Sequence, residues 1–142
     1  MPPNCSPVAD GMTHDPRRRV IVDGANVVGA GARGWWRDRA GAMRGLADRL
    51  VCYADADGVS VELVLDAPDL PEGPHRSVMV HHATRRGRDA GDDRIRELLA
   101  DADPSTVRVV TSDRTLRTDA RQLGAEVIGA GTFLDRLEDA GC

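Results

Sequence analysis

The sequence predicts an α/β protein, organised as a three-layer α/β/α sandwich around a mostly parallel central sheet of about five strands. Strand-like and helix-like segments alternate along the chain, which is the pattern of parallel βαβ units. The first apolar run, Val20 to Val22, is wholly β-branched and lacks polar alternation, as expected of a strand covered on both faces. The chain has 142 residues, which suits one domain. We expect residues 1–17 to form a flexible tail and residues 18–142 to form the domain.

Five apolar runs are expected to form strands, namely residues 20–22, 59–65, 77–80, 107–110 and 126–128. Helices are expected from about Asp38, over residues 91–101, from Asp113 to Gly124, and around Phe133. The helix after Asp38 has apolar residues at helical spacing, which predicts a face packed on the sheet: Met43, Leu46, Ala47, Leu50, Val51 and Ala54. We expect a turn after Asp23, a mobile or substrate-contacting loop over residues 29–34, and a Pro-rich loop over residues 67–74.

The composition limits the kinds of partner. The net charge of −4 excludes a generally basic nucleic-acid-binding surface, so a polyanion would have to bind a local patch. Cys5, Cys52 and Cys142 form no C-x-x-C pair, so the sequence indicates neither a disulfide framework nor a zinc site. A reducing cytoplasm is the expected location. No run approaches the roughly 18 apolar residues of a membrane span, so no membrane association is expected.

Acidic residues follow three of the predicted strands, at Asp23, Asp66 and Asp113. Because ligands bind at the carboxyl ends of strands in such sheets, these side chains mark a candidate site. Helical spacing places Asp92 on the buried stripe of its helix and turns Asp93 outward. Clustered carboxylates repel one another unless a cation neutralises them. The oxygen-only donors therefore favour Mg²⁺ or Mn²⁺, which support hydrolysis of phosphodiesters.

The residues around the first acid and the later strands resemble a known family. The segments 22–29 (VDGANVVG), 90–95 (AGDDRI) and 110–113 (VTSD) are similar to the NYN domain, the YacP-like branch of the PIN-like nucleases. The resemblance implies a compact Rossmann-like sandwich and a divalent-metal endoribonuclease that cleaves RNA. It also implies catalytic roles for five residues, the first three as metal ligands: Asp23, Asp92, Asp113, Asn26 and Asp93. The family often has Ala where this chain has Gly91, which leaves the start of that helix less well defined.

Substrate contacts are expected from basic and aromatic residues near these acids. An Arg-rich loop precedes the helix of Asp92 and would hold phosphates of single-stranded RNA. Trp35 or its neighbour Trp36 would stack on unpaired bases, with the other packed over the sheet edge. The full set of expected substrate contacts is Arg85, Arg86, Arg88, Arg33, Trp35 and Ser112, and Thr111 is a further hydroxyl beside the acids.

Other interpretations remain open at this point. An Asp that closes a strand is often only a turn or cap residue, and Asp89 is expected to be a cap or turn residue, whereas Asp66 could be a wall of the site. Residues 29–34 satisfy G-x-G-x-x-G but lie too far from the strand to bind a dinucleotide. The alternatives to a nuclease are an RNA- or partner-binding module without turnover and a small-molecule phosphohydrolase. A monomer or homodimer, and a need for the ribosome or another RNA-processing partner, are equally open.

Overall fold

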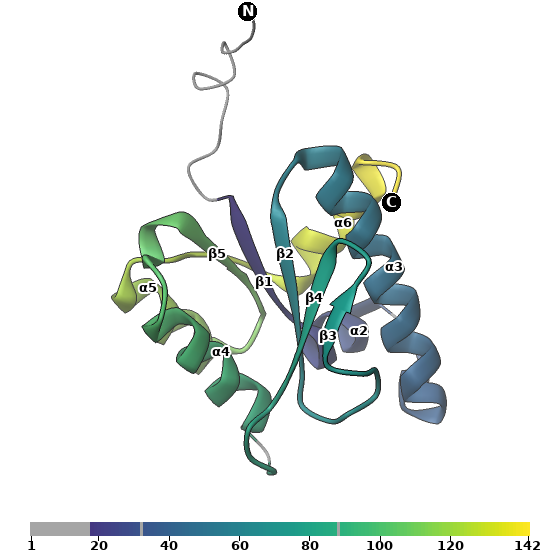
Figure 1. The fold of residues 1–142 in the computed structure, drawn as a ribbon, viewed down its shortest axis with the longest axis horizontal. Helices are drawn as coiled ribbons and strands as arrows, with labels where there is room; N and C mark the ends of the chain where they lie inside the picture. Colours follow the sequence, from purple (N-terminus) through teal and green to yellow (C-terminus); the bar gives the residue numbers. More distant parts are fainter. Residues whose placement is uncertain (1–17, 32, 88) are drawn as a thin grey trace, which may run out of the picture.

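The computed structural model describes residues 18–31, 33–87 and 89–142, so the predicted tail, Cys5 and Arg88 lie outside the described residues. Its centre is a six-stranded sheet in the order β3-β4-β2-β1-β5-β6 (Figure 1). The strands are β1 Arg19–Asp23, β2 Ser60–Leu65, β3 Gly73–His75, β4 Val78–His82, β5 Val107–Val110 and β6 Glu126–Ile128. All neighbouring strands pair in parallel except β3, which pairs antiparallel with β4.

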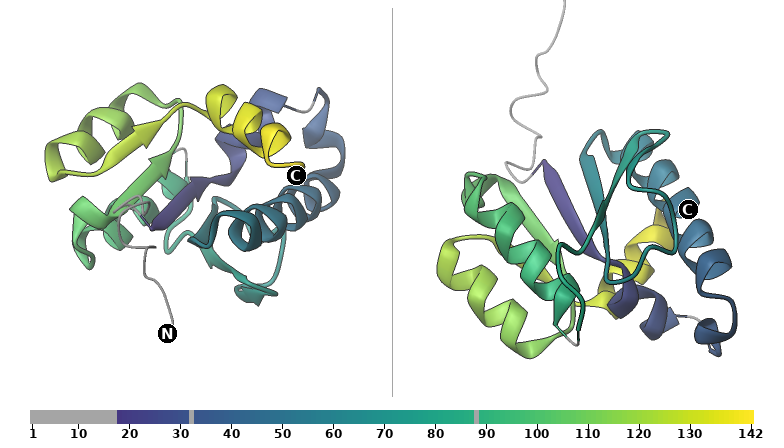
Figure 2. Two further views of the ribbon diagram at one scale, coloured as in Figure 1. Left: turned by 90° about the horizontal axis from the view of Figure 1, so that it is seen from above. Right: turned by 60° about the horizontal axis from the view of Figure 1, so that its bottom comes forward.

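Helices cover both faces of the sheet, which confirms the predicted three-layer sandwich (Figure 2). They are α2 Gly24–Gly31, α3 Arg39–Asp57, α4 Ala90–Ala100, α5 Arg114–Leu123 and α6 Ala130–Asp139, with short 3₁₀ turns η1 Trp35–Asp38 and η2 Pro104–Thr106. Alternate residues of β1 face opposite layers: Val20 and Val22 pack with α2, α3 and α6, whereas Ile21 packs with α4 and α5. Asp23, two residues after Ile21, therefore faces the layer of α4 and α5.

Most predicted elements are present, and the predicted apolar face of α3 is buried against the sheet. The segment after Asp23 was expected to be a turn, and this expectation is wrong, because residues 24–31 form α2. Glycines make this segment a poor helix former in isolation, so contacts with α3 and α6 must stabilise it. A Cβ at Gly24 would lie 3.0 Å from side chains of Leu63 and Leu65, so the close approach of α2 to β2 requires glycine here.

Two further differences concern the edge of the sheet and the cysteines. The predicted loop at residues 67–74 ends in β3, a three-residue edge strand that includes Pro74. An edge position tolerates proline, which lacks a backbone N–H. The expectation of no disulfide is wrong, because Cys52 of α3 is bonded to Cys142, 90 residues further on. Spacing in sequence gives no signal for such a pairing, because only the fold brings the two residues together. Among the described residues, no helix is long and apolar enough to cross a membrane.

Candidate active site

The site is built around Asp23, the last residue of the central strand β1. Asp23 as a whole residue is 8% exposed, so its charge is largely removed from water. Val22 pairs with Val110 in the parallel register, which places Thr111, the next residue of the β5 chain, beside Asp23. The Thr111 hydroxyl donates a hydrogen bond to Asp23 Oδ2 (2.9 Å), and the backbone N–H of Asn26 donates a long one to Oδ1 (3.4 Å). Both oxygens are therefore held in place by the protein.

Burial gives Asp23 an unusual affinity for protons. Loss of hydration raises its pKa to about 6, although the hydrogen bonds from Thr111 and Asn26 lower it, and the charges of Asp66 and Asp113 raise it further. The carboxylate is thus mostly ionised at neutral pH, but at a cost in free energy that a bound cation would remove. Perturbed carboxylates of this kind are more frequent at functional sites than at structural ones.

Asp92 faces Asp23 from the first turn of α4. Its pKa is also raised to about 6, first by burial and then by the negative charges of Asp23 and Asp113, whereas Arg96 lowers it. Among the described residues, no side chain or backbone group donates a hydrogen bond to this half-buried carboxylate. The helix begins at Ala90, and a Cβ at Gly91 would lie 3.5 Å from Asp66 Cβ, which is ordinary contact. Glycine at this position therefore does not displace the start of the helix.

Asp113 is the residue that caps α5. Its Oδ1 accepts a hydrogen bond from the backbone N–H of Leu116 (2.9 Å), as predicted for an N-cap. The backbone N–H of Asp113 in turn donates to the Thr111 hydroxyl (3.1 Å). One carboxylate oxygen is engaged by the helix, and Asp113 still lines the same hollow as Asp23 and Asp92. Asp113 therefore caps α5 and lines the acidic hollow at the same time.

The three acids open on one hollow of about 350 Å³ at the carboxyl end of the sheet. Its lining is Asp23, Ala25, Asn26, Asp66, Asp89, Gly91, Asp92 and Asp113. Asp66 is thus a wall of the site, and its Oδ1 accepts a hydrogen bond from the Arg39 guanidinium (2.9 Å). Asp89 is a turn residue at the N-cap position of α4, in line with the cap-or-turn interpretation; its side chain makes no capping hydrogen bond, and the residue lines the hollow.

Asn26 and Ser112 connect the hollow to the surrounding elements. Asn26 Oδ1 accepts a hydrogen bond from the backbone N–H of Ser112 (2.8 Å), which ties α2 to the connection between β5 and α5. The Ser112 Oγ accepts one from the backbone N–H of Ala130 (2.8 Å), at the first residue of α6. The Ser112 hydroxyl is therefore directed to α6 and lies outside the acidic hollow.

The arginines that are predicted to contact RNA differ in their ion pairs. Asp93 lies outside the lining of the hollow and pairs with Arg85 (2.6 Å) and Arg96 (3.1 Å), so Arg85 is already partly neutralised. Arg86 and Arg33 are exposed, and neither has an ion-pair partner among the described residues. Arg88, the third arginine of the loop that is predicted to hold RNA phosphates, lies outside the described residues.

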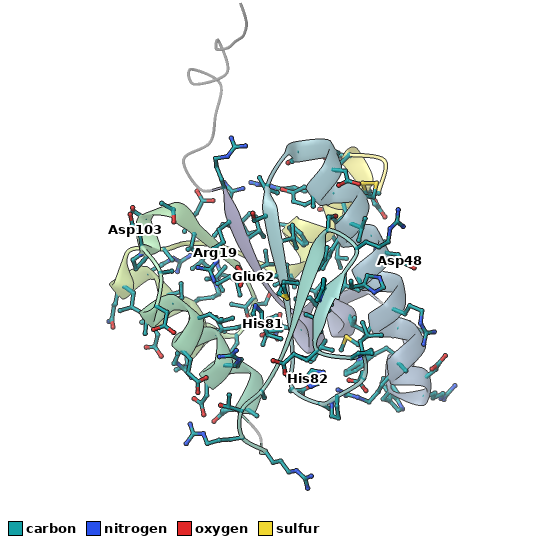
Figure 3. The ribbon with its side chains drawn as sticks, viewed as in Figure 1. Arg19, Asp48, Glu62, His81, His82 and Asp103 are labelled. Carbon is teal, nitrogen blue, oxygen red and sulfur yellow. A yellow bond between two sulfur atoms is a disulfide. The ribbon has the colours of Figure 1, made fainter. Side chains whose placement is uncertain are left out.

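The aromatic and histidine side chains divide between packing and exposure. Trp35 packs against the core, and the Arg39 guanidinium lies 4.7 Å from its ring centre, whereas Trp36 is 63% exposed. Trp36 is thus the tryptophan available for stacking. His81 and His82 are partly buried and engaged by Glu62 and by the Leu70 carbonyl oxygen, respectively (Figure 3). Neither histidine lines the acidic hollow.

The donor set of the hollow fits a hard divalent cation by its chemistry. All the ionisable side chains that line it are carboxylates, and that of Asp92 lacks a hydrogen-bond donor among the described residues. In the described part of the chain, no group of three or more acidic, His or Cys side chains is placed closely enough to hold a metal ion by itself. An ion at this hollow would therefore need further ligands from water or a substrate phosphate, as Mg²⁺ and Mn²⁺ commonly have. Asp23, Asp92 and Asp113 are the residues that would hold the ion.

Comparison with known proteins agrees with this architecture. The family model of the YacP-like NYN domain matches residues 20–141. The crystal structure of Rae1 (YacP) from Bacillus subtilis superposes with a TM-score of 0.68 and 24% identity, over 86% of this chain and 74% of that chain. A tryptophan-to-leucine mutant of that protein gives 0.67 and 25%, over 87% and 76%. No curated protein matches by sequence. This chain therefore belongs to the YacP-like NYN domain family and has the PIN-like nuclease fold.

Proposed function

We propose that the protein is a divalent-metal-dependent endoribonuclease that hydrolyses phosphodiester bonds of single-stranded RNA at the acidic hollow. The observation that carries this proposal is the buried Asp23 carboxylate, which faces Asp92 and Asp113 across one hollow and whose pKa is raised to about 6. A cluster of carboxylates repels a phosphodiester unless cations bridge the two. The family likeness supports RNA as the substrate class.

Each residue has a distinct part in the proposed reaction. A bound Mg²⁺ or Mn²⁺ would supply an activated water and stabilise the charge that develops at phosphorus. Asp23 is held by Thr111 and Asn26, so that its oxygens keep a fixed orientation. Asp92 accepts no hydrogen bond from any described residue, so its carboxylate oxygens would be free to hold the ion together with Asp23 and Asp113. Asp113 and Asn26 fix the connection that forms the far wall.

The test is cleavage of a labelled single-stranded RNA by purified protein with Mn²⁺ or Mg²⁺, compared with EDTA. Asp23→Asn and Asp92→Asn should each abolish cleavage, because each removes a charge that faces the proposed metal. Asp135→Asn is the matched control, since Asp135 is an exposed residue of α6 outside the hollow. Intact RNA with wild-type protein and either metal would refute the proposal in favour of a binding module. Release of phosphate from mononucleotides without RNA cleavage would instead indicate a small-molecule phosphohydrolase.

A further inference from the structure

A second hollow lies on the other side of the β5–α5 connection and has the opposite charge. It measures about 320 Å³ and is lined by Ser112, Arg114, Arg117, Thr118 and Arg121. No acidic side chain of the described residues contributes to its lining. The arginines occupy positions i, i+3 and i+7 of α5, which place them on one face of the helix. Leu116 and Ala120 are buried on a different face of the helix, whereas Arg114 and Arg121 are exposed and Arg117 is partly buried.

Like Arg33 and Arg86, these arginines have no ion pair among the described residues, and the three line one common hollow. Arg19, Arg39, Arg85, Arg94, Arg96 and Arg108 each pair with an acidic side chain. Arg114, Arg117 and Arg121 have no acidic partner among the described residues. The single acid of α5, Asp119, pairs with Arg96 of α4 on another side of the helix (2.9 Å). Three positive charges therefore remain available on a protein whose net charge is negative.

The start of α6 adds to this positive surface. Gly129 is the N-cap of the ten-residue α6, which has no acidic residue in its first turn. A Cβ at Gly129 would lie 3.5 Å from Arg117 Nη1, so the guanidinium stands next to the beginning of α6. The N-terminal end of a helix carries partial positive charge and has free N–H groups. The arginines and the N-terminal end of α6 would thus both attract an anion bound in this hollow.

We propose that this groove, formed by Arg114, Arg117 and Arg121 along α5, binds the phosphates of the RNA strand beyond the bond cleaved at the acidic hollow. Ser112 lines the groove and the next residue, Asp113, lines the acidic hollow, so the two hollows adjoin through consecutive residues. Seven residues of helix span about 10 Å, which is long enough for the guanidinium groups to contact more than one phosphate of a strand. Guanidinium groups bind phosphates through paired hydrogen bonds. The inference deepens the proposed function, because it assigns the strand path of the same site.

Binding can be separated from cleavage by working in the Asp23→Asn background. The probe is a fluorescent single-stranded RNA of about 12 nucleotides, followed by anisotropy over a range of salt concentrations. The double variant R117A/R121A should raise the dissociation constant about tenfold. It should also reduce the slope of log K against log salt by about 1.4, because each lost phosphate contact on a single strand contributes about 0.7. The charge reversal R117E/R121E should weaken binding further.

The matched control is R44A/R136A, which removes the same charge from exposed positions on α3 and α6 away from the groove. It should leave the affinity and the salt slope unchanged. Thermal unfolding of each variant shows whether α5 remains folded. Equal effects of the two double variants, or no RNA binding by the parent protein at low salt, would overturn the inference. A mononucleotide that binds as tightly as the oligomer would also overturn it, because the groove would then be a nucleotide pocket.

The proposed function and the groove can fail separately. If the groove variants bind RNA normally while wild-type protein cleaves it with Mn²⁺, the groove assignment is wrong and the nuclease proposal stands. If the protein never cleaves RNA but loses affinity only in the groove variants, the groove binds RNA and the nuclease proposal is wrong.

Discussion

The buried charge of Asp23 should make the metal-free protein less stable at neutral pH than at mildly acidic pH. Its pKa is about 6 in the folded protein and 3.8 ordinarily, so the folded state binds more protons between these values. The free energy of unfolding therefore falls as the pH rises through this interval. Each unit of difference is worth about 1.4 kcal/mol, which gives a loss of about 3 kcal/mol between about pH 3 and pH 7.

Two other carboxylates bear on this measurement. Asp92 also has a raised pKa, so it acts in the same direction, but its partial exposure makes its contribution smaller. Glu62 acts in the opposite direction: although burial opposes its ionisation, hydrogen bonds from Arg19 and His81 lower its pKa to about 2. Its stabilisation is lost only as the pH falls below about 4.5 and through 2. Measurements at pH 5 and pH 7 therefore avoid most of the titration of Glu62 and retain somewhat less than half of the effect of Asp23, about 1.3 kcal/mol.

The assay is denaturant unfolding in EDTA at the two pH values. Asp23→Asn should be more stable than wild type at pH 7 and should show a much smaller difference between pH 5 and pH 7. The control Asp135→Asn should behave as wild type does. Mn²⁺ at about 100 times its dissociation constant should restore about 2.7 kcal/mol to wild type at pH 7 but not to Asp23→Asn. If the free energy of unfolding of Asp23→Asn depended on pH as that of wild type does, the buried charge of Asp23 would not be the cause of the pH dependence.

Two further predictions concern the supports of the fold and of the site. Thr111→Val removes the hydroxyl that donates to Asp23 Oδ2 and accepts from Asp113, so it should raise the pKa of Asp23 above 6 and cost about 1–3 kcal/mol in unfolding free energy. Titration of the carboxyl carbon by NMR measures the first effect, and Thr106→Val at an exposed hydroxyl is its control; an unchanged titration contradicts the role. Reduction of the bond between Cys52 and Cys142 opens a loop of about 90 residues and should lower the free energy of unfolding by up to about 4–5 kcal/mol. Thermal unfolding with and without reductant measures this loss, and equal transitions would show that the bond does not stabilise the fold.

The sequence predicted those parts of the fold that rest on long, local patterns. The apolar stripe of α3 recurs over about three turns of helix, from Met43 to Ala54, and the β-branched run before Asp23 permits little but a buried strand. Helix α2 could not be predicted in this way, because it has only eight residues and three of them are glycine. Its stability comes from tertiary contacts, which local sequence does not record. The pairing of Cys52 with Cys142 was missed for the same reason.

The site shows the same division. Helical phase was enough to place Asp92 toward the sheet, and the strand ends were enough to place Asp23 and Asp113 with it. Phase alone could not show that Asp93 is engaged by Arg85 and Arg96. The arginine face of α5 was detectable, because its period is visible in the sequence. The Arg-rich loop before α4 is denser in basic residues and therefore gives the stronger sequence signal.

The three residues Thr111, Ser112 and Asp113 explain why the acidic hollow and the arginine groove should act as one unit. Thr111 holds Asp23 at the floor of the site, Ser112 is hydrogen-bonded to both α2 and α6, and Asp113 caps the helix that carries the arginines. An RNA strand bound along α5 would therefore contact a helix that begins at the same connection that orients the Asp23 carboxylate. Because this connection is fixed at five hydrogen bonds, it is suited to hold phosphates and carboxylates in a constant relation during cleavage.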